Sequence, residues 1–245
     1  MHPYLDHPGP IPFAHRGGAA GGVENALSAF TAVQALGYRF VETDVRTTRD
    51  GVALVFHDAD TRRLTGTPGR VSALTAVQVR RLALSGGEPV PTLEEALEAF
   101  PDLRFNVDLK DEGGVGAVPA VLARTRAYGR VCVTSFSQRR IERARRLLPA
   151  GACLGLGVGG VAQLLALRRA CGASVLQLPW SLGGGRTLPR WAVALGQRHG
   201  LAVHVWTVDE PDAMRAALDL GVDGVMTDRP AVLRDVLRER GQWHR

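Results

Sequence analysis

Three stretches of the sequence carry groups suited to acid–base chemistry and to binding an anion. His15 and Arg16 precede two glycines, Glu42 and Asp44 are separated by one residue, and His57 follows further along the chain. Glycine lets a backbone approach an anion closely, arginine matches phosphate oxygens, and histidine exchanges protons near neutral pH. On its own, the His15-Arg16 segment fits an anion-binding site and a buried histidine beside a surface arginine equally well. Together the stretches indicate acid–base chemistry on an anionic group.

Glu42 and Asp44 lie on one face of a predicted strand, because side chains alternate along a strand. A solvent-facing polar hairpin is one interpretation. Two like charges beside an imidazole are unfavourable unless a cation neutralises them, and carboxylate oxygens suit a hard divalent ion. We therefore predict a site for one divalent cation, Mg²⁺ or Ca²⁺, with Mn²⁺ also suited. Such an oxygen-rich site leaves His57 free as an acid or base.

The segment 104–110 alternates polar and apolar residues, which puts Asn106, Asp108 and Lys110 on one face. That face should point into the fold, where unpaired charges are costly. Lys110 is the only lysine in the chain, so a compact ammonium is expected to matter there. We predict Asp108 as a metal ligand and Lys110 as a phosphate contact. Trp206, at the end of a later strand, is either a packing residue or a wall for an organic group.

Strand-like and helix-like segments alternate along the 245 residues, which favours a parallel sheet covered by helices. The length suits a barrel of roughly 250 residues, whose active site lies at the carboxyl ends of its strands. We predict an α/β fold, a single TIM-type (β/α)8 barrel forming one domain over residues 1–245. The predicted strands are 11–15, 39–45, 52–57, 104–109, 130–136, 152–158, 174–178, 201–207 and 224–227. The predicted helices are 24–36, 93–100, 138–147, 161–170, 188–198, 212–220 and 231–240.

The strands 39–45 and 52–57 have no helix between them, and Asp50-Gly51 is a strong signal for a two-residue hairpin turn. That loop places Asp44 opposite His57, gathering carboxylates and an imidazole in one local element. Residues from about 60 to 90 then form a small insertion over one side of the barrel mouth, with a short helix at 74–82.

Composition excludes several other classes of protein. The formal charge of +6 comes from scattered arginines, in pairs such as Arg62-Arg63, without interleaved aromatic residues, so we expect a solvated surface and no nucleic-acid partner. The most apolar stretch, 154–167, is shorter than the roughly 20 residues of a membrane span, so no stable membrane insertion is expected. Three cysteines without metal or redox spacing, and no signal-like apolar start, favour the cytoplasm.

With these residues in place, the chain resembles the glycerophosphodiester phosphodiesterase family, a group of barrel enzymes. The matching elements occur in family order over nearly the whole chain. They are His15-Arg16-Gly17, Glu24-Asn25, Glu42-Thr43-Asp44-Val45, Thr48-Arg49-Asp50-Gly51, His57-Asp58, Asp108-Leu109-Lys110, Ser135-Phe136, Trp206-Thr207-Val208 and Thr227-Asp228-Arg229-Pro230. As a set they are specific, although no single element is.

The resemblance implies a hydrolase of lipid and glycerol metabolism that releases sn-glycerol 3-phosphate and an alcohol from a small glycerophosphodiester. It implies His15 and His57 as the catalytic acid and base, Arg16, Lys110 and Trp206 as substrate contacts, and Glu42, Asp44 and Asp108 as metal ligands. It also implies that the substrate's own glycerol hydroxyl attacks first. Asp108 departs from the family, which usually has glutamate there.

Two alternatives stay open. The nearer one is a phospholipase-like or sphingomyelinase-D-like phosphodiesterase of the same architecture, which should carry an apolar patch near the mouth. No large apolar groove is legible in the sequence, so water-soluble diesters are favoured. The other is a non-catalytic barrel that binds phosphorylated ligands, which would lose nothing on removal of His57. The oligomeric state is left open.

Overall fold

The fold is a parallel barrel in a computed structural model that describes residues 2–244. Its main sheet has nine strands, eight of them in the order β6-β5-β4-β2-β1-β11-β10-β7, with β3 paired to β2. A parallel bridge from Gly155 to Val175 joins the two end strands, so the barrel is nearly closed. The predicted TIM-type barrel is confirmed. The eight parallel strands are β1 (Ile11–Ala14), β2 (Phe40–Thr47), β4 (Arg104–Leu109), β5 (Val131–Thr134), β6 (Cys153–Leu154), β7 (Val175–Pro179), β10 (Ala202–Trp206) and β11 (Gly224–Thr227).

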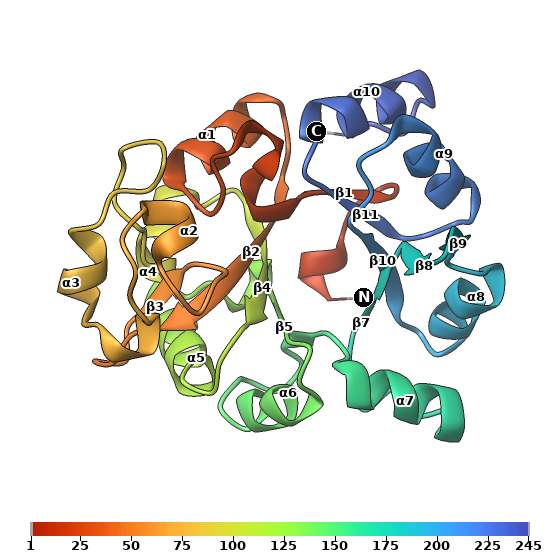
Figure 1. Ribbon diagram of the computed structural model, residues 1–245. Coiled ribbons are helices and arrows are strands. Elements are labelled where there is room, and N and C mark those ends of the chain that lie inside the picture. Colours follow the sequence, from red (N-terminus) through yellow and green to blue (C-terminus); the bar gives the residue numbers. More distant parts are fainter. Residues whose placement is uncertain (1, 245) are drawn as a thin grey trace.

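Helices surround the strands in Figure 1. The outer face of β4, for example, buries Phe105, Val107 and Leu109 against helix residues, as its alternation predicts. The ring of helices is α1 (Leu27–Ala35), α4 (Leu93–Ala99), α5 (Gly114–Thr125), α6 (Gln138–Arg145), α7 (Val158–Leu167), α8 (Arg190–Arg198), α9 (Pro211–Asp219) and α10 (Pro230–Glu239). No helix among residues 2–244 is long and apolar enough to cross a membrane.

The hairpin that carries His57 differs from its prediction by one residue. β3 (Ala53–Val55) pairs antiparallel with β2 so that Val45 faces Val55, and Phe56 N–H donates to the Asp44 carbonyl at 2.9 Å. Asp44 is therefore opposite Phe56, and the predicted pairing with His57 was wrong. The loop has three residues and ends in Gly51 with a φ of 81°, the left-handed conformation that closes such loops. His57 lies beyond the paired residues, yet it still lines the pocket at the barrel mouth.

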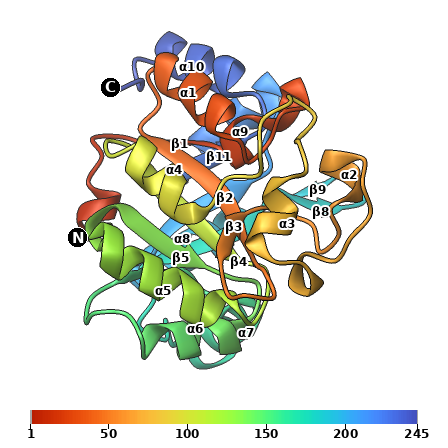
Figure 2. The ribbon, with the colours of Figure 1, turned by 90° about the vertical axis from the view of Figure 1, so that its left-hand side faces the viewer.

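The insertion after the hairpin contains α2 (Arg62–Thr65) and α3 (Ala76–Arg80). It has a small core of its own, in which Leu64, Val71 and Val79 pack with Phe56. Figure 2 shows α2 and α3 on the same side of the barrel as the short hairpin of β8 (Ser181–Gly183) and β9 (Arg186–Thr187), which the sequence did not predict. At that end of the barrel, the insertion lies at the left edge and this hairpin at the right edge in Figure 1.

Candidate active site

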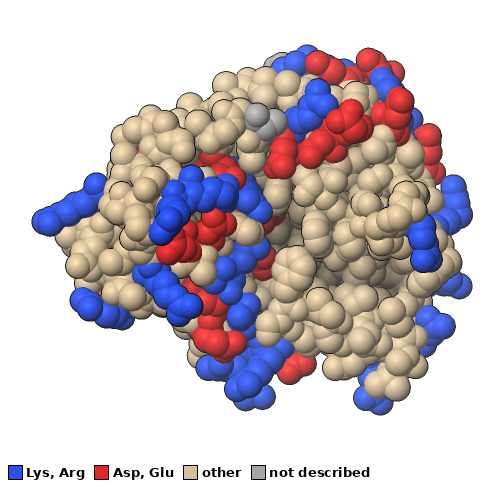
Figure 3. Space-filling model, in the orientation of Figure 1, with Lys and Arg blue, Asp and Glu red and all other residues tan. Residues whose placement is uncertain are grey.

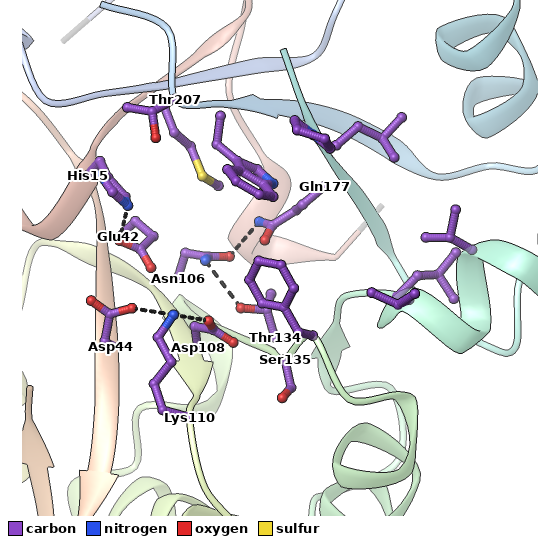
Figure 4. Close-up of a pocket in the computed structure, with 18 of the residues that line it drawn as sticks. His15, Glu42, Asp44, Asn106, Asp108, Lys110, Thr134, Ser135, Gln177 and Thr207 are labelled. Carbon is purple, nitrogen blue, oxygen red and sulfur yellow. Dashed lines mark hydrogen bonds and ion pairs between the residues drawn. The ribbon is translucent and has the colours of Figure 1, made fainter. Parts of the chain in front are cut away.

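A pocket of about 570 Å³ opens at the carboxyl ends of the strands. Every residue assigned to the site from the sequence lines it, although these residues come from five strands and the turns after them. The eight are His15, Arg16, Glu42, Asp44, His57, Asp108, Lys110 and Trp206. Figure 4 shows how Glu42, Asp44, Asp108 and Lys110 face one another across the floor of this pocket.

Two nearly buried carboxylates pair with the single lysine, and a third, that of Glu42, lines the same pocket. Lys110 Nζ lies 2.8 Å from Asp44 Oδ1 and 2.5 Å from Asp108 Oδ2. Burial disfavours the Asp44 carboxylate, but Lys110 and Arg16 outweigh burial and lower its pKa. At Asp108 burial wins and the pKa is raised. Burial, with the nearby Asp44 charge, raises the pKa of Glu42 to about 8.

The donor set suits a hard divalent cation. Asp108 Oδ1 is buried without a hydrogen-bond partner, and burial together with the nearby Asp44 charge keeps Glu42 near its protonated form. Within residues 2–244 no three His, Cys, Asp or Glu side chains already converge as metal ligands. Lys110 Nζ lies between Asp44 and Asp108, so a cation shared by these carboxylates requires the ammonium to shift. The carboxylates thus fit a divalent cation by the chemistry of their oxygen atoms, and binding requires Lys110 to move.

His15 is held by a carboxylate on either side. Its Nδ1 lies 2.6 Å from Asp228 Oδ1, and its Nε2 lies 3.7 Å from Glu42 Oε2. Asp228 is fixed in turn, because its backbone N–H donates to Asp209 Oδ1 at 2.8 Å. Burial disfavours the protonated ring, but Glu42 and Asp228 outweigh it, so the pKa of His15 is raised.

His57 and Arg16 are also held by acidic side chains. His57 Nδ1 lies 2.7 Å from Asp58 Oδ1. Arg16, in a left-handed conformation with a φ of 52°, places Nη1 3.0 Å from Glu24 Oε1 and Nε 3.2 Å from Asp44 Oδ2. Both histidines therefore have Nδ1 committed to an aspartate, which orients the ring. Nε2 of His15 faces Glu42 at 3.7 Å, which is beyond hydrogen-bond distance, so Nε2 of both rings is available to substrate.

The other half of the pocket is apolar, which corrects the expectation that no large apolar groove exists. Phe136 is 57% exposed, Val158 64% and Leu165 45%, and all three line the pocket. In Figure 3 charged residues crowd the left side of the central hollow, whereas the surface to its right and below is mostly uncharged. We call this apolar surface the α7 wall. It consists of Phe136, Leu156, Val158, Val161, Leu165 and Leu178.

Several supporting residues were not assigned roles from the sequence. Asp58 and Asp228 appear in recognisable motifs, but their contacts with the histidines depend on side-chain directions. Gln177 was missed entirely, although a lone glutamine in the apolar strand β7 is an available signal. Its Nε2 donates to Asn106 Oδ1 at 2.8 Å, which orients Asn106 in the barrel. Trp206 packs edge-on against Phe136 at 5.5 Å and so contributes to the pocket wall.

Comparison with known proteins adds the family. Residues 15–232 match the "Glycerophosphoryl diester phosphodiesterase family". A Mycobacterium tuberculosis protein named "Probable glycerophosphodiester phosphodiesterase 2" is 40% identical over 251 residues, covering 98% of this chain and 95% of that protein. The human protein "Lysophospholipase D GDPD1" is 26% identical over 267 residues, covering 91% of this chain and 85% of its own length.

A solved structure supports the architecture. The phosphodiesterase from Oleispira antarctica, in complex with the product sn-glycerol-3-phosphate, has a TM-score of 0.79 at 22% identity, covering 94% of this chain and 97% of that one. The likeness extends around the whole barrel. The chain belongs to the glycerophosphoryl diester phosphodiesterase family and is an enzyme that hydrolyses phosphoric diesters.

Proposed function

We propose that the enzyme hydrolyses glycerophosphodiesters to sn-glycerol 3-phosphate and an alcohol, with one divalent cation and two histidines as acid and base. One observation carries this proposal: two histidines, each oriented by an aspartate, line the same pocket as three buried carboxylates. The product complex of the Oleispira antarctica relative supports glycerol 3-phosphate as the product.

In this mechanism Arg16 and Lys110 hold the non-bridging phosphate oxygens, so that charge developing in the transition state meets fixed positive groups. Glu42, Asp44 and Asp108 would hold the cation, which when bound would supply further positive charge to the phosphate. One of His15 and His57 removes the proton of the substrate's glycerol hydroxyl as its oxygen attacks phosphorus, and the other protonates the alkoxide that leaves. Water then adds to the cyclic phosphate and opens it, which gives sn-glycerol 3-phosphate. Nδ1 of each ring is bound to an aspartate, so Nε2 carries out the transfer.

The test uses purified protein stripped of metal, resupplied separately with Mg²⁺, Ca²⁺ or Mn²⁺, and given glycerophosphocholine. We expect glycerol 3-phosphate release that needs a divalent ion and falls by about 10²–10⁴-fold in His15→Ala and in His57→Ala. Equal release with and without chelator would remove the cation from the mechanism. Full activity in either histidine variant would remove that histidine.

A second candidate substrate is a single-chain glycerophospholipid, for which the α7 wall is the specific observation. A hydrocarbon chain on this wall would leave the phosphodiester over Arg16 and Lys110, at the charged half of the same pocket. The name of the human relative supports hydrolysis on the alcohol side of the phosphate. Burying a chain there contributes roughly 0.8 kcal/mol per methylene.

The two candidates are separated by comparing kcat/KM for glycerophosphocholine with that for a monoacyl glycerophosphocholine presented below its micelle concentration. Val158→Asp should lower kcat/KM for the acyl substrate and leave the soluble diester unaffected. Val77→Asp is a matched control, because Val77 is 61% exposed but lies on α3, outside the pocket. A preference for the soluble diester in the wild-type enzyme would exclude the second candidate.

We also propose a cytoplasmic site of action, which the three free cysteines support, since reduced thiols are characteristic of that compartment.

A further inference from the structure

An unbroken series of ion pairs joins the two sides of the active site through a residue of the insertion. Arg63, on α2, donates from Nε and Nη2 to Asp58 at 2.6 and 3.1 Å. It also donates from Nη1 and Nη2 to Glu24 at 3.0 and 2.7 Å. Asp58 contacts the His57 ring, and Glu24 accepts from Arg16. We call Asp58, Arg63 and Glu24 the arginine bridge.

The bridge has the geometry that only a guanidinium provides. A planar guanidinium offers a fork of donors that can engage two carboxylates at once, whereas an ammonium is a point charge on a flexible stem. Arg63 makes paired contacts with both carboxylates, although its side chain is 48% exposed and lies outside the pocket lining. Water can solvate such an exposed guanidinium, so Arg63 does not need these ion pairs for its own stability. Its paired contacts are therefore better explained by the two carboxylates that they hold in place.

We propose that Arg63 is a positioning residue that orients His57 through Asp58 and Arg16 through Glu24, an inference that rests on the roles proposed for His57 and Arg16. An ionised carboxylate only accepts hydrogen bonds, so Asp58 requires the His57 proton on Nδ1. Nε2 of His57 then presents its lone pair to the pocket. Arg63 keeps Asp58 in place, and the same guanidinium fixes the carboxylate that orients Arg16.

The neighbouring residues explain how the insertion delivers this contact. Leu64 is buried beside Arg63 and packs in one cluster with Phe56, which precedes His57, and with Ala26, which follows Glu24 and Asn25. The apolar core of the insertion thus fixes α2 against both segments that the bridge connects. The insertion therefore helps to assemble the active site, in addition to covering one side of the barrel mouth.

The first test reads the His57 ring directly in the full chain labelled with ¹⁵N-histidine, with its signal assigned by its absence in His57→Gln. We expect the Nδ1–H tautomer in the wild type and a mixture of tautomers in Arg63→Ala. Millimolar guanidinium should restore the single tautomer, because the vacated site is open to solvent. Arg62→Ala, on the same helix and also exposed, is the matched control and should resemble the wild type.

The second test measures glycerophosphocholine hydrolysis by the metal-loaded enzyme. Supporting residues of this kind typically change activity by about 10–100-fold, and we expect a loss of that size in Arg63→Ala, with kcat reduced through His57 and KM increased through Arg16. Guanidinium should rescue Arg63→Ala, whereas ethylammonium should not. Arg63→Lys should stay impaired despite its charge, and it replaces Arg63→Ala if that variant does not fold.

An unchanged His57 tautomer in the Arg63 variants, or full activity in Arg63→Lys, overturns the proposal. If the wild-type enzyme releases no glycerol 3-phosphate with any ion, the proposed function fails. In that case the tautomer measurement still decides whether Arg63 positions His57.

Discussion

Glu42→Gln should stabilise the protein at neutral pH while abolishing its activity, because the fold raises the pKa of this carboxyl and the native state must keep it protonated. Glu42 is 5% exposed, and burial raises its pKa to about 8 from an ordinary value of 4.5. Between these two values the native state retains a proton that the unfolded chain releases. Stability therefore falls as the pH rises from 4.5 to 8 and levels off above 8.

The magnitude follows from that interval. Each pH unit within it costs about 1.4 kcal/mol, so keeping Glu42 protonated in the native state lowers the free energy of unfolding by about 3 kcal/mol at pH 7, relative to its value below pH 4.5. Glutamine carries no such penalty, and its amide oxygen can still accept the Arg16 backbone N–H that Glu42 Oε2 accepts at 3.2 Å. The advantage of the variant should be near zero below pH 4.5 and grow with pH.

The assay is urea unfolding of chelator-treated protein at several pH values between 4.5 and 8.5, for the wild type, Glu42→Gln and Glu98→Gln. Glu98 is exposed on α4, so its variant should follow the wild type at every pH. Excess divalent cation should stabilise the wild type, flatten its pH dependence and leave Glu42→Gln nearly unchanged. A difference between wild type and Glu42→Gln that does not change with pH would refute the reasoning.

Two further predictions concern the other histidine and the hairpin. Asp228→Asn removes one of the charges that raise the pKa of His15, so the limb of the kcat/KM pH profile that reports His15 deprotonation should move to lower pH; an unmoved limb would show that Asp228 does not set it. Gly51→Ala should lower the free energy of unfolding by about 1 kcal/mol, because Gly51 has a φ of 81°. Gly116→Ala, on the exposed face of α5, should raise the free energy of unfolding by a similar amount. Thermal unfolding in which both variants shift stability in the same direction would contradict this account.

Strong alternation and functional motifs were the parts of the molecule that the sequence could predict. β4 was predicted with its observed bounds, Arg104–Leu109, because polar and apolar residues alternate without exception along it. The set of pocket residues followed from polar side chains at strand ends, where a parallel barrel must gather them. Neither inference required knowledge of distant contacts.

The features that the sequence did not predict depend on competition between local signals and tertiary contacts. α5 was missed because Gly114, Gly116 and Pro119 weaken its helical signal, while burial of Val118 and Leu122 stabilises it. The hairpin loop gained a residue where Asp50 Oδ1 accepts from Thr48 and from the Ala76 backbone. That second contact ties the turn to the insertion, which hairpin rules do not consider.

The α7 wall illustrates a different limit. The apolar residues of 154–167 were correctly expected to form strand, turn and helix, but such residues ordinarily face a core. Val158 and Leu165 are exposed because no element of residues 2–244 covers that side of α7. Similarly, the Arg62-Arg63 pair was interpreted as solvated surface, which fits Arg62 and misses the bridging role of Arg63. Exposure is decided by what packs over a residue, which its neighbours in sequence do not reveal.

The arginine-rich composition makes Lys110 an intrinsic reporter. Because the chain has one lysine, reductive methylation with ¹³C-formaldehyde introduces a single ε-dimethylammonium resonance, well separated from that of the α-amino group. That resonance belongs to a nitrogen located between Asp44 and Asp108. Cation titrations and substrate exchange could thus be followed at the floor of the pocket by one-dimensional spectra, without mutation or an engineered tag.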